Sequence, residues 1–214
     1  MRKNLQTWIV GQNAPPASRV CFLRKSSAGT VIHNNIKCGG KQIEAAFDGI
    51  YKFIKNHKKL NEKNIANFGL CMGGGYAFRA SVKNPKVKAC VSLFPLLMNF
   101  ADQGNIPVWM KRGKWSSYQY ADDYLEGMRT LEEGTHKADF LMVYSSDDNW
   151  MTPEASQKLL DKAQGYKESI HIQDKPAYVS EETIMHAMPV GEQYHWVKHI
   201  AADFIAERLN GGNK

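Results

Sequence analysis

The sequence has few cysteines, and they are not arranged as in a metal site or a disulfide framework. Its 214 residues contain four cysteines, with no Cys-x-x-Cys pair and no histidine at zinc-ligand spacing. A hydrophobic run of membrane-spanning length is also missing, and no signal-peptide core follows the basic Met1-Arg2-Lys3. We therefore expect reduced thiols, no bound metal, no membrane partner and a cytoplasmic location.

Acidic residues are fewer than basic ones, which gives a formal net charge of +7. Such an excess is typical of some nucleic-acid-binding proteins, but no recognised nucleic-acid motif accompanies it. The lysines are dispersed, and the densest group, at residues 52–63, is typical of the solvated face and end of one helix. We expect no nucleic-acid partner.

Internal repeats and low-complexity tracts are absent, so we expect one domain over residues 1–214. What is present is an alternation of short apolar runs with segments of helical periodicity. Strands are expected at 19–23, 65–68, 87–95, 138–144 and 168–172, and helices at 43–54, 76–82, 153–163 and 194–209. This alternation predicts the α/β class, with a mostly parallel sheet flanked by helices.

One segment interrupts the alternation. Residues 97–135 carry two tryptophans and three tyrosines mixed with glycine and charged residues. One hypothesis is that this insert forms a lid or pocket wall. The other is that its aromatic side chains simply pack the insert against the sheet.

The most informative motif is Gly69-Leu70-Cys71-Met72-Gly73-Gly74, which lies where the apolar run 65–68 gives way to a helical pattern. This order predicts a sharp strand-to-helix turn with Cys71 at its tip, and small residues on both sides are needed to avoid crowding. The N-terminus of the following helix would favour a thiolate and an oxyanion beside it. The alternative is a buried structural cysteine in a glycine-rich loop.

Partners for such a cysteine are expected after later strands, because functional residues gather at the carboxyl ends of parallel strands. Asp147 and Asp148 follow the expected strand 138–144, and His186 follows the strand 168–172 and a loop. A thiol needs a base, and an imidazole base needs a carboxylate to fix its tautomer. The order Cys71, Asp148, His186 is that of the triad in α/β-hydrolases.

Each partner has an alternative reading, which for His186 is a loop histidine without a catalytic role. Asp147 or Asp148 would serve equally well as a cap for the helix that begins near Pro153, and the choice between the two carboxylates stays open, with Asp148 preferred. His195 and His199 are weaker base candidates than His186, because both lie inside the closing helix.

With these motifs the chain resembles the α/β-hydrolase superfamily, and within it the dienelactone hydrolase family, over roughly residues 43–209. The resemblance implies that Cys71 is the nucleophile, His186 the base, Asp148 the orienting acid and the backbone N–H of Met72 an oxyanion donor. It further implies opening of a small ester, lactone or thioester through an acyl-enzyme, without a cofactor. Acyl transfer to an acceptor other than water is an alternative for the same cysteine.

Two features depart from the family pattern. The spacing of 77 residues between Cys71 and Asp148 is long, and the excess falls in the aromatic insert. Only about 65 residues precede the turn strand, and no His-Gly-Gly-type loop that would supply a second oxyanion donor occurs in them. We therefore expect N-terminal strands to be missing, which leaves a truncated, non-catalytic hydrolase-like protein as the other alternative. The sequence does not fix the oligomeric state.

Overall fold

The computed structural model describes residues 7–10, 20–23, 40–95, 133–146, 148, 151–173 and 191–211. Strands and helices alternate along most of this length, as the sequence predicted. The elements are β1 (Thr7–Val10), β2 (Val20–Leu23), α2 (Gly40–Asn56), β3 (Ile65–Leu70), α3 (Met72–Lys83), β4 (Val87–Leu93), β5 (Asp139–Ser145), α7 (Pro153–Asp161), β6 (Lys167–Ile172) and α8 (Gly191–Leu209).

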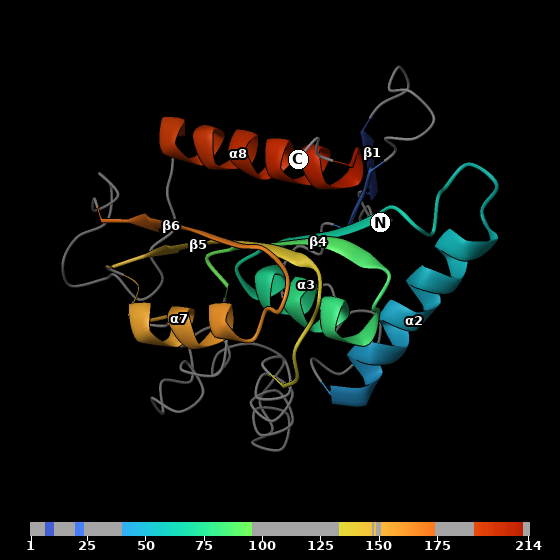
Figure 1. The fold of residues 1–214 in the computed structure, drawn as a ribbon, viewed down its shortest axis with the longest axis horizontal. Coiled ribbons are helices and arrows are strands. Elements are labelled where there is room, and N and C mark those ends of the chain that lie inside the picture. The colour runs from blue at the N-terminus through green and yellow to red at the C-terminus, as the bar shows by residue number, and fades with distance from the viewer. Residues whose placement is uncertain are drawn as a thin grey trace, which may run out of the picture.

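Four of the strands form a parallel sheet in the order β3-β4-β5-β6 (Figure 1). Its register aligns the strand ends, because Leu93 of β4 pairs with Leu70 of β3 on one side and with Val143 of β5 on the other. All four carboxyl ends therefore meet at one edge of the sheet, which is where α/β proteins place their functional residues.

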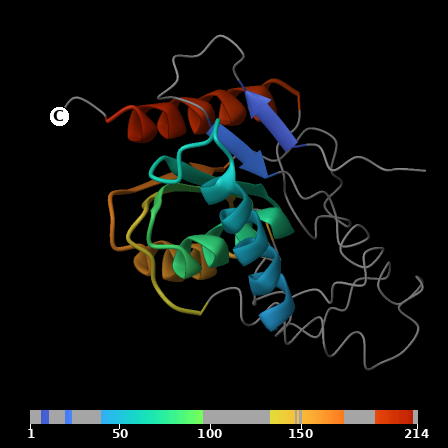
Figure 2. The same cartoon turned by 90° about the vertical axis from the view of Figure 1, so that its right-hand side faces the viewer.

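Helices cover both faces of this sheet. Figure 1 shows α8 on one face, with α3 and α7 on the other, and Figure 2 shows α2 lying beside α3. Central strand β4 reflects this arrangement, since Cys90 packs into the α2–α3–α7 core while Val91 packs into the α8 core. None of the helices in the described ranges is both long and apolar enough to cross a membrane.

A short antiparallel pair, β1 with β2, precedes α2 and lies outside the four-stranded sheet. Strand β2 packs against β3 at the end of that sheet (Figure 2). The expected strand at 19–23 is β2. Strand β1 was not predicted, because only Trp8, Ile9 and Val10 carry an apolar pattern there.

The expected insert at 97–135 falls almost wholly outside the described residues, and its role stays a prediction. The chain just before the insert and the chain near its end are both held by α3. On one side Pro95 lies so close to Gly74 that a Cβ added to the glycine would sit 3.0 Å from the proline Cα. On the other side, Arg79 donates a 2.8 Å hydrogen bond to the carbonyl of Glu133.

A buried polar network joins β3 to the two helices beside it. The Asn67 Nδ2 group donates to Ser81 Oγ at 2.9 Å and to the Tyr51 hydroxyl at 3.0 Å, and that hydroxyl donates to the Ala80 carbonyl at 3.1 Å. Burial raises the pKa of Tyr51 well above its usual range, so the phenol stays protonated and can donate. Because satisfied buried networks specify one arrangement, this one fixes α2 and α3 relative to the strand that leads into Cys71.

A buried histidine makes the stability of this core depend on pH. His136 is 3% exposed, and its ring packs edge-on against Phe78 and Phe140, with ring centroids 4.9 and 5.2 Å away. Burial lowers the pKa of His136 from 6.5 to about 4. The unfolded chain takes up a proton at this residue below pH 6.5, whereas the folded chain does so only near pH 4. Stability is therefore lost as the pH falls through that window.

We predict that His136→Leu removes this pH dependence. The difference of about 2.5 pKa units corresponds to about 3 kcal/mol in the free energy of unfolding between pH 7 and pH 4. Urea unfolding at several pH values measures it. Phe78→Leu is the control, because it opens space in the same cluster without removing a titrating group and should lower stability equally at every pH. An unchanged slope in His136→Leu would contradict the prediction.

Candidate active site at the carboxyl edge of the sheet

Cys71 occupies a strained turn between a strand and a helix. It is the single residue between the end of β3 at Leu70 and the start of α3 at Met72. Its backbone has φ 58° and ψ −127°, a conformation that residues with a Cβ rarely adopt. The side chain is half-buried. Strain of this kind costs about 1–3 kcal/mol and persists where the surrounding structure enforces it, most often at functional sites.

The glycines beside Cys71 are required by close backbone packing. A Cβ on Gly69 would lie 1.8 Å from the carbonyl oxygen of Gly73, which no side chain can tolerate. A Cβ on Gly74 would lie 3.0 Å from Pro95. The first turn of α3 therefore rests directly on the end of β3, as expected from the Gly69-x-Cys71-x-Gly73 pattern.

Backbone hydrogen bonds tie the strand ends together at this edge. The Cys71 N–H donates to the Leu93 carbonyl at 2.9 Å, and the Phe94 N–H donates to the Val143 carbonyl at 2.7 Å. Phe94 also has a positive φ of 46° and is 1% exposed. The turn that carries Cys71 is thus fixed to β4, and the turn after β4 is fixed to β5.

Further hydrogen bonds hold the first turn of α3 in place. Ser92 Oγ donates a 2.9 Å hydrogen bond to the Gly74 carbonyl, and both residues are buried. The Gly74 N–H donates to the Cys71 carbonyl at 2.8 Å. Met72 is the first residue of α3, and an N–H at that position has no acceptor within its own helix. An oxyanion beside Cys71 would meet this end of the helix.

Asp148 lies in the turn after β5 and is 3% exposed. Its Oδ1 atom accepts a 3.0 Å hydrogen bond from the Met151 N–H. The N-cap of α7 is Thr152, whose side chain accepts from the Ala155 N–H at 3.3 Å. Asp148 is therefore not the cap of this helix, and its carboxylate is buried two strands away from Cys71 at the same edge of the sheet.

The remaining candidates divide into two groups. His186 and Asp147 lie outside the residues that the structure describes. His195 and His199 are exposed on α8, on the face of the sheet opposite α3 (Figure 1). Sequence reasoning did not single out His171, which lies on β6 with its Nε2 atom 2.6 Å from Ser146 Oγ. The sequence did contain a signal for His171, because it lies on a strand of alternating polar and apolar residues that ends at the carboxyl edge of the sheet.

A family model named "Dienelactone hydrolase family" matches residues 22–169, which include Cys71 and Asp148. The chain belongs to the dienelactone hydrolase family. No curated protein sequence matches this family member significantly.

Solved structures similar to this dienelactone hydrolase family member have the α/β-hydrolase fold. The 2,6-dihydroxy-pseudo-oxynicotine hydrolase is 13% identical, with a TM-score of 0.63 over 86% of this chain and 50% of that one. Acetyl xylan esterase 1 from Thermoanaerobacterium sp. is 15% identical, with a TM-score of 0.54 over 76% and 51%. An esterase from Pyrococcus furiosus is 14% identical, with a TM-score of 0.54 over 81% and 64%. The chain spans about half the length of the first two structures.

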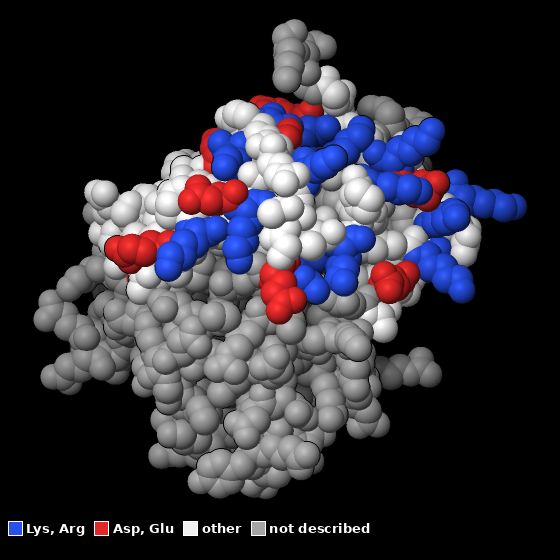
Figure 3. All heavy atoms as spheres, turned by 60° about the horizontal axis from the view of Figure 1, so that its bottom comes forward, with Lys and Arg blue, Asp and Glu red and all other residues white. Residues whose placement is uncertain are grey.

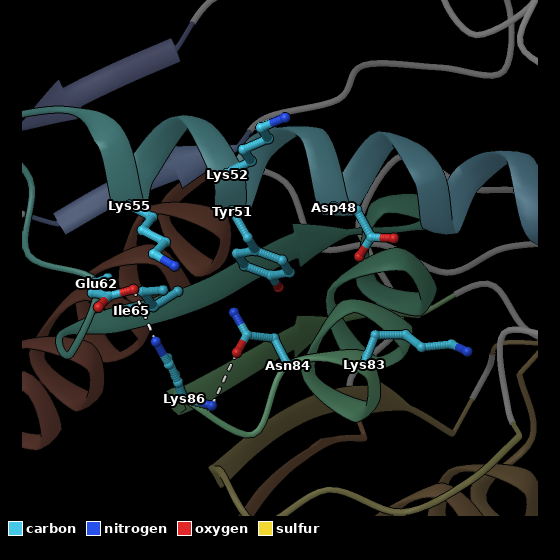
Figure 4. Close-up of a pocket in the computed structure, with 9 residues that line it drawn as sticks. All are labelled: Asp48, Tyr51, Lys52, Lys55, Glu62, Ile65, Lys83, Asn84 and Lys86. Carbon is cyan, nitrogen blue, oxygen red and sulfur yellow. Dashed lines mark hydrogen bonds and ion pairs between the residues drawn. The ribbon is translucent and has the colours of Figure 1, made fainter.

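A pocket of about 280 Å³ lies at the opposite edge of the sheet, the amino edge, where the strands begin (Figure 4). It is lined mainly by α2, by the turn before β3 and by the turn after α3, with Lys55 and Lys86 beside Glu62. Lys86 Nζ donates to Glu62 at 2.8 Å, and the Lys86 ammonium lowers the pKa of that carboxyl. Figure 3 shows many further basic side chains, drawn blue, over the described part of the surface that it presents.

The lysines at the amino edge have a structural explanation. Helices α2 and α3 both end there, with Lys55 and Lys83 in their last turns. Positive side chains at helix C-termini offset the negative end of the helix dipole. Because the pocket lies at the edge of the sheet opposite Cys71, it is separate from the candidate active site. Within the described ranges, no group of three or more His, Cys, Asp or Glu side chains is placed to hold a metal ion.

Proposed function

We propose that this protein cleaves a small ester, lactone or thioester, with Cys71 as the nucleophile, His186 as the base and Asp148 as the acid that orients the imidazole. The observation that carries the proposal is the positive φ of Cys71 at the start of α3. Membership of the dienelactone hydrolase family supports the reaction class, and so do the names of the two similar esterases.

The proposed reaction has two steps. The Cys71 sulfur attacks the acyl carbon while His186 takes the thiol proton and passes it to the leaving oxygen or sulfur. The oxyanion that forms is stabilised by the N–H of Met72 at the start of α3. Water, activated by His186, then attacks the thioester, releases the acid and restores the thiol.

The cysteines of this chain fit such chemistry. Cys71 and Cys90 are both free thiols. A nucleophilic thiol must stay reduced, which is the state favoured in the cytoplasm, and we propose that location. Burial raises the pKa of Cys90 to about 12, so this second thiol is both inaccessible and protonated.

Trapping the acyl-enzyme tests the proposal. A Cys21→Ala/Cys38→Ala background leaves only Cys71 and Cys90. We expect iodoacetamide to modify one thiol per native chain, at Cys71, and a rapidly quenched reaction with an activated ester to add one acyl group to the same peptide. Mass spectrometry reads both adducts. Cys90 should react only after unfolding in denaturant. An acyl group on any other residue, or none, would refute the proposed mechanism.

A further inference from the structure

An exposed serine and histidine form a short hydrogen bond beside the candidate active site. Ser146 Oγ lies 2.6 Å from His171 Nε2, and both residues are exposed. The His171 ring is stacked on Tyr144, with ring centroids 4.6 Å apart and planes 14° from parallel. Tyr144 in turn packs against the core under α3 and α7. The imidazole is therefore held in one orientation although solvent reaches it.

This pair connects β6 to the turn that carries Asp148. Tyr144 pairs with His171 and Ser145 with Ile172 in the parallel ladder between β5 and β6. One residue further on, the Ser146 N–H donates to the Ile172 carbonyl at 3.0 Å. Ser146 is thus attached to β6 through its main chain and its side chain, two residues before Asp148.

The same strand end leads toward the proposed base. β6 ends at Ile172, and the chain continues from there to His186. The hydrogen bonds between Ser146 and the end of β6 therefore hold the start of the turn that carries Asp148 next to the start of the segment that leads to His186. A hydrogen bond between exposed groups adds little to global stability, so its consequence is local.

We propose that Ser146 and His171 are positioning residues, whose hydrogen bond holds the β5–α7 turn so that the Asp148 carboxylate meets the catalytic imidazole. This rests on the proposed function, because it gives Asp148 the role of the orienting acid. A carboxylate that moves by about 1 Å loses much of its effect on the imidazolium, and such displacements cost about 100-fold in rate. The pair acts through Asp148 and does not touch the reacting atoms.

Kinetics of four variants and one control variant test this proposal. His171→Leu and Ser146→Ala should each lower kcat about 10- to 100-fold with KM changed less than about twofold. The double variant should be no worse than either single one, because both remove the same hydrogen bond. His171→Gln should recover most of the activity, since its side-chain amide can still form a hydrogen bond with Ser146 Oγ. Ser169→Ala, an exposed serine two residues earlier on β6, is the matched control and should behave as wild type.

The pH profile separates positioning from a structural role. A displaced carboxylate stabilises the imidazolium less, so the acid limb of kcat/KM should move to lower pH in His171→Leu and Ser146→Ala. A lower rate together with a lower melting temperature, but with the acid limb of kcat/KM at the same pH as in wild type, would overturn the proposal. So would wild-type kinetics in both variants, and Ser146→Ala decides the matter if His171→Leu does not fold.

Cys71→Ala is measured in parallel. Full activity of Cys71→Ala would overturn the proposed function itself. An inactive Cys71→Ala together with a fully active His171→Leu would overturn only the positioning role.

Discussion

Cys71→Ala is expected to lower kcat for an activated ester by about 10⁴-fold or more. The thiol forms the covalent intermediate in the proposed mechanism, and no other group would replace it. Alanine keeps the Cβ and with it the strained backbone at φ 58°, so the turn and the helix dipole are unchanged. The loss is therefore in chemistry. Steady-state hydrolysis over a range of substrate concentrations, read against circular dichroism of the same samples, measures it.

Cys90→Ala is the matched control for this experiment. Cys90 is fully buried in β4, in the core under α3, and it has no role in the proposed reaction. We expect its kcat/KM to stay within about twofold of wild type, with some loss of stability from the smaller side chain. If Cys71→Ala turned over substrate at the wild-type rate, the assignment of the nucleophile would be wrong.

Gly69→Ala is expected to disrupt the turn as a whole. The added methyl group would overlap the Gly73 carbonyl at 1.8 Å, so the first turn of α3 would have to move away from β3. Overpacking against backbone is not relieved by a rotamer change, and we expect a loss of at least about 3 kcal/mol in the free energy of unfolding. Urea denaturation measures this loss, and hydrolysis of the same ester should fall with it.

Two other glycines make this a graded series. A Cβ on Gly74 would meet Pro95 at 3.0 Å, a milder overlap, so Gly74→Ala should lose less stability. Gly49 lies exposed on α2, and a Cβ added there would have no neighbouring atom within 4 Å. Gly49→Ala should stabilise the protein by about 0.5–1 kcal/mol through helix propensity. A Gly69→Ala protein as stable as wild type would show that β3 and α3 are not in direct backbone contact.

Much of this fold follows from the sequence because its strongest signals are local. The apolar run 65–68 and the glycines around Cys71 predict a strand, a sharp turn and a helix, and the structure contains β3, Cys71 and α3 in that order. Helical periodicity also located α2 and α8 to within a few residues. Such patterns depend on spacing along the chain, which a sequence displays directly.

Features that depend on contacts between distant residues were harder to predict. The sequence left open whether Asp148 caps α7, and the structure gives that role to Thr152, because the helix begins one turn later than the acidic pair. His171 meets Ser146 only through the register of β5 with β6. The four-residue β1 is stabilised by its pairing with β2, since its own sequence carries a weak pattern.

Helix α3 bounds the aromatic insert at both ends, which has a consequence for how members of this family can differ. Pro95 rests on Gly74, and Glu133 accepts from Arg79 one to two turns further along the same helix. Lengthening or shortening the chain between these two fixed points adds little loop-closure entropy, about 0.6 kcal/mol for each doubling. The length of the chain between these two points can therefore change at little cost to α3, the helix that begins at Met72 directly after Cys71.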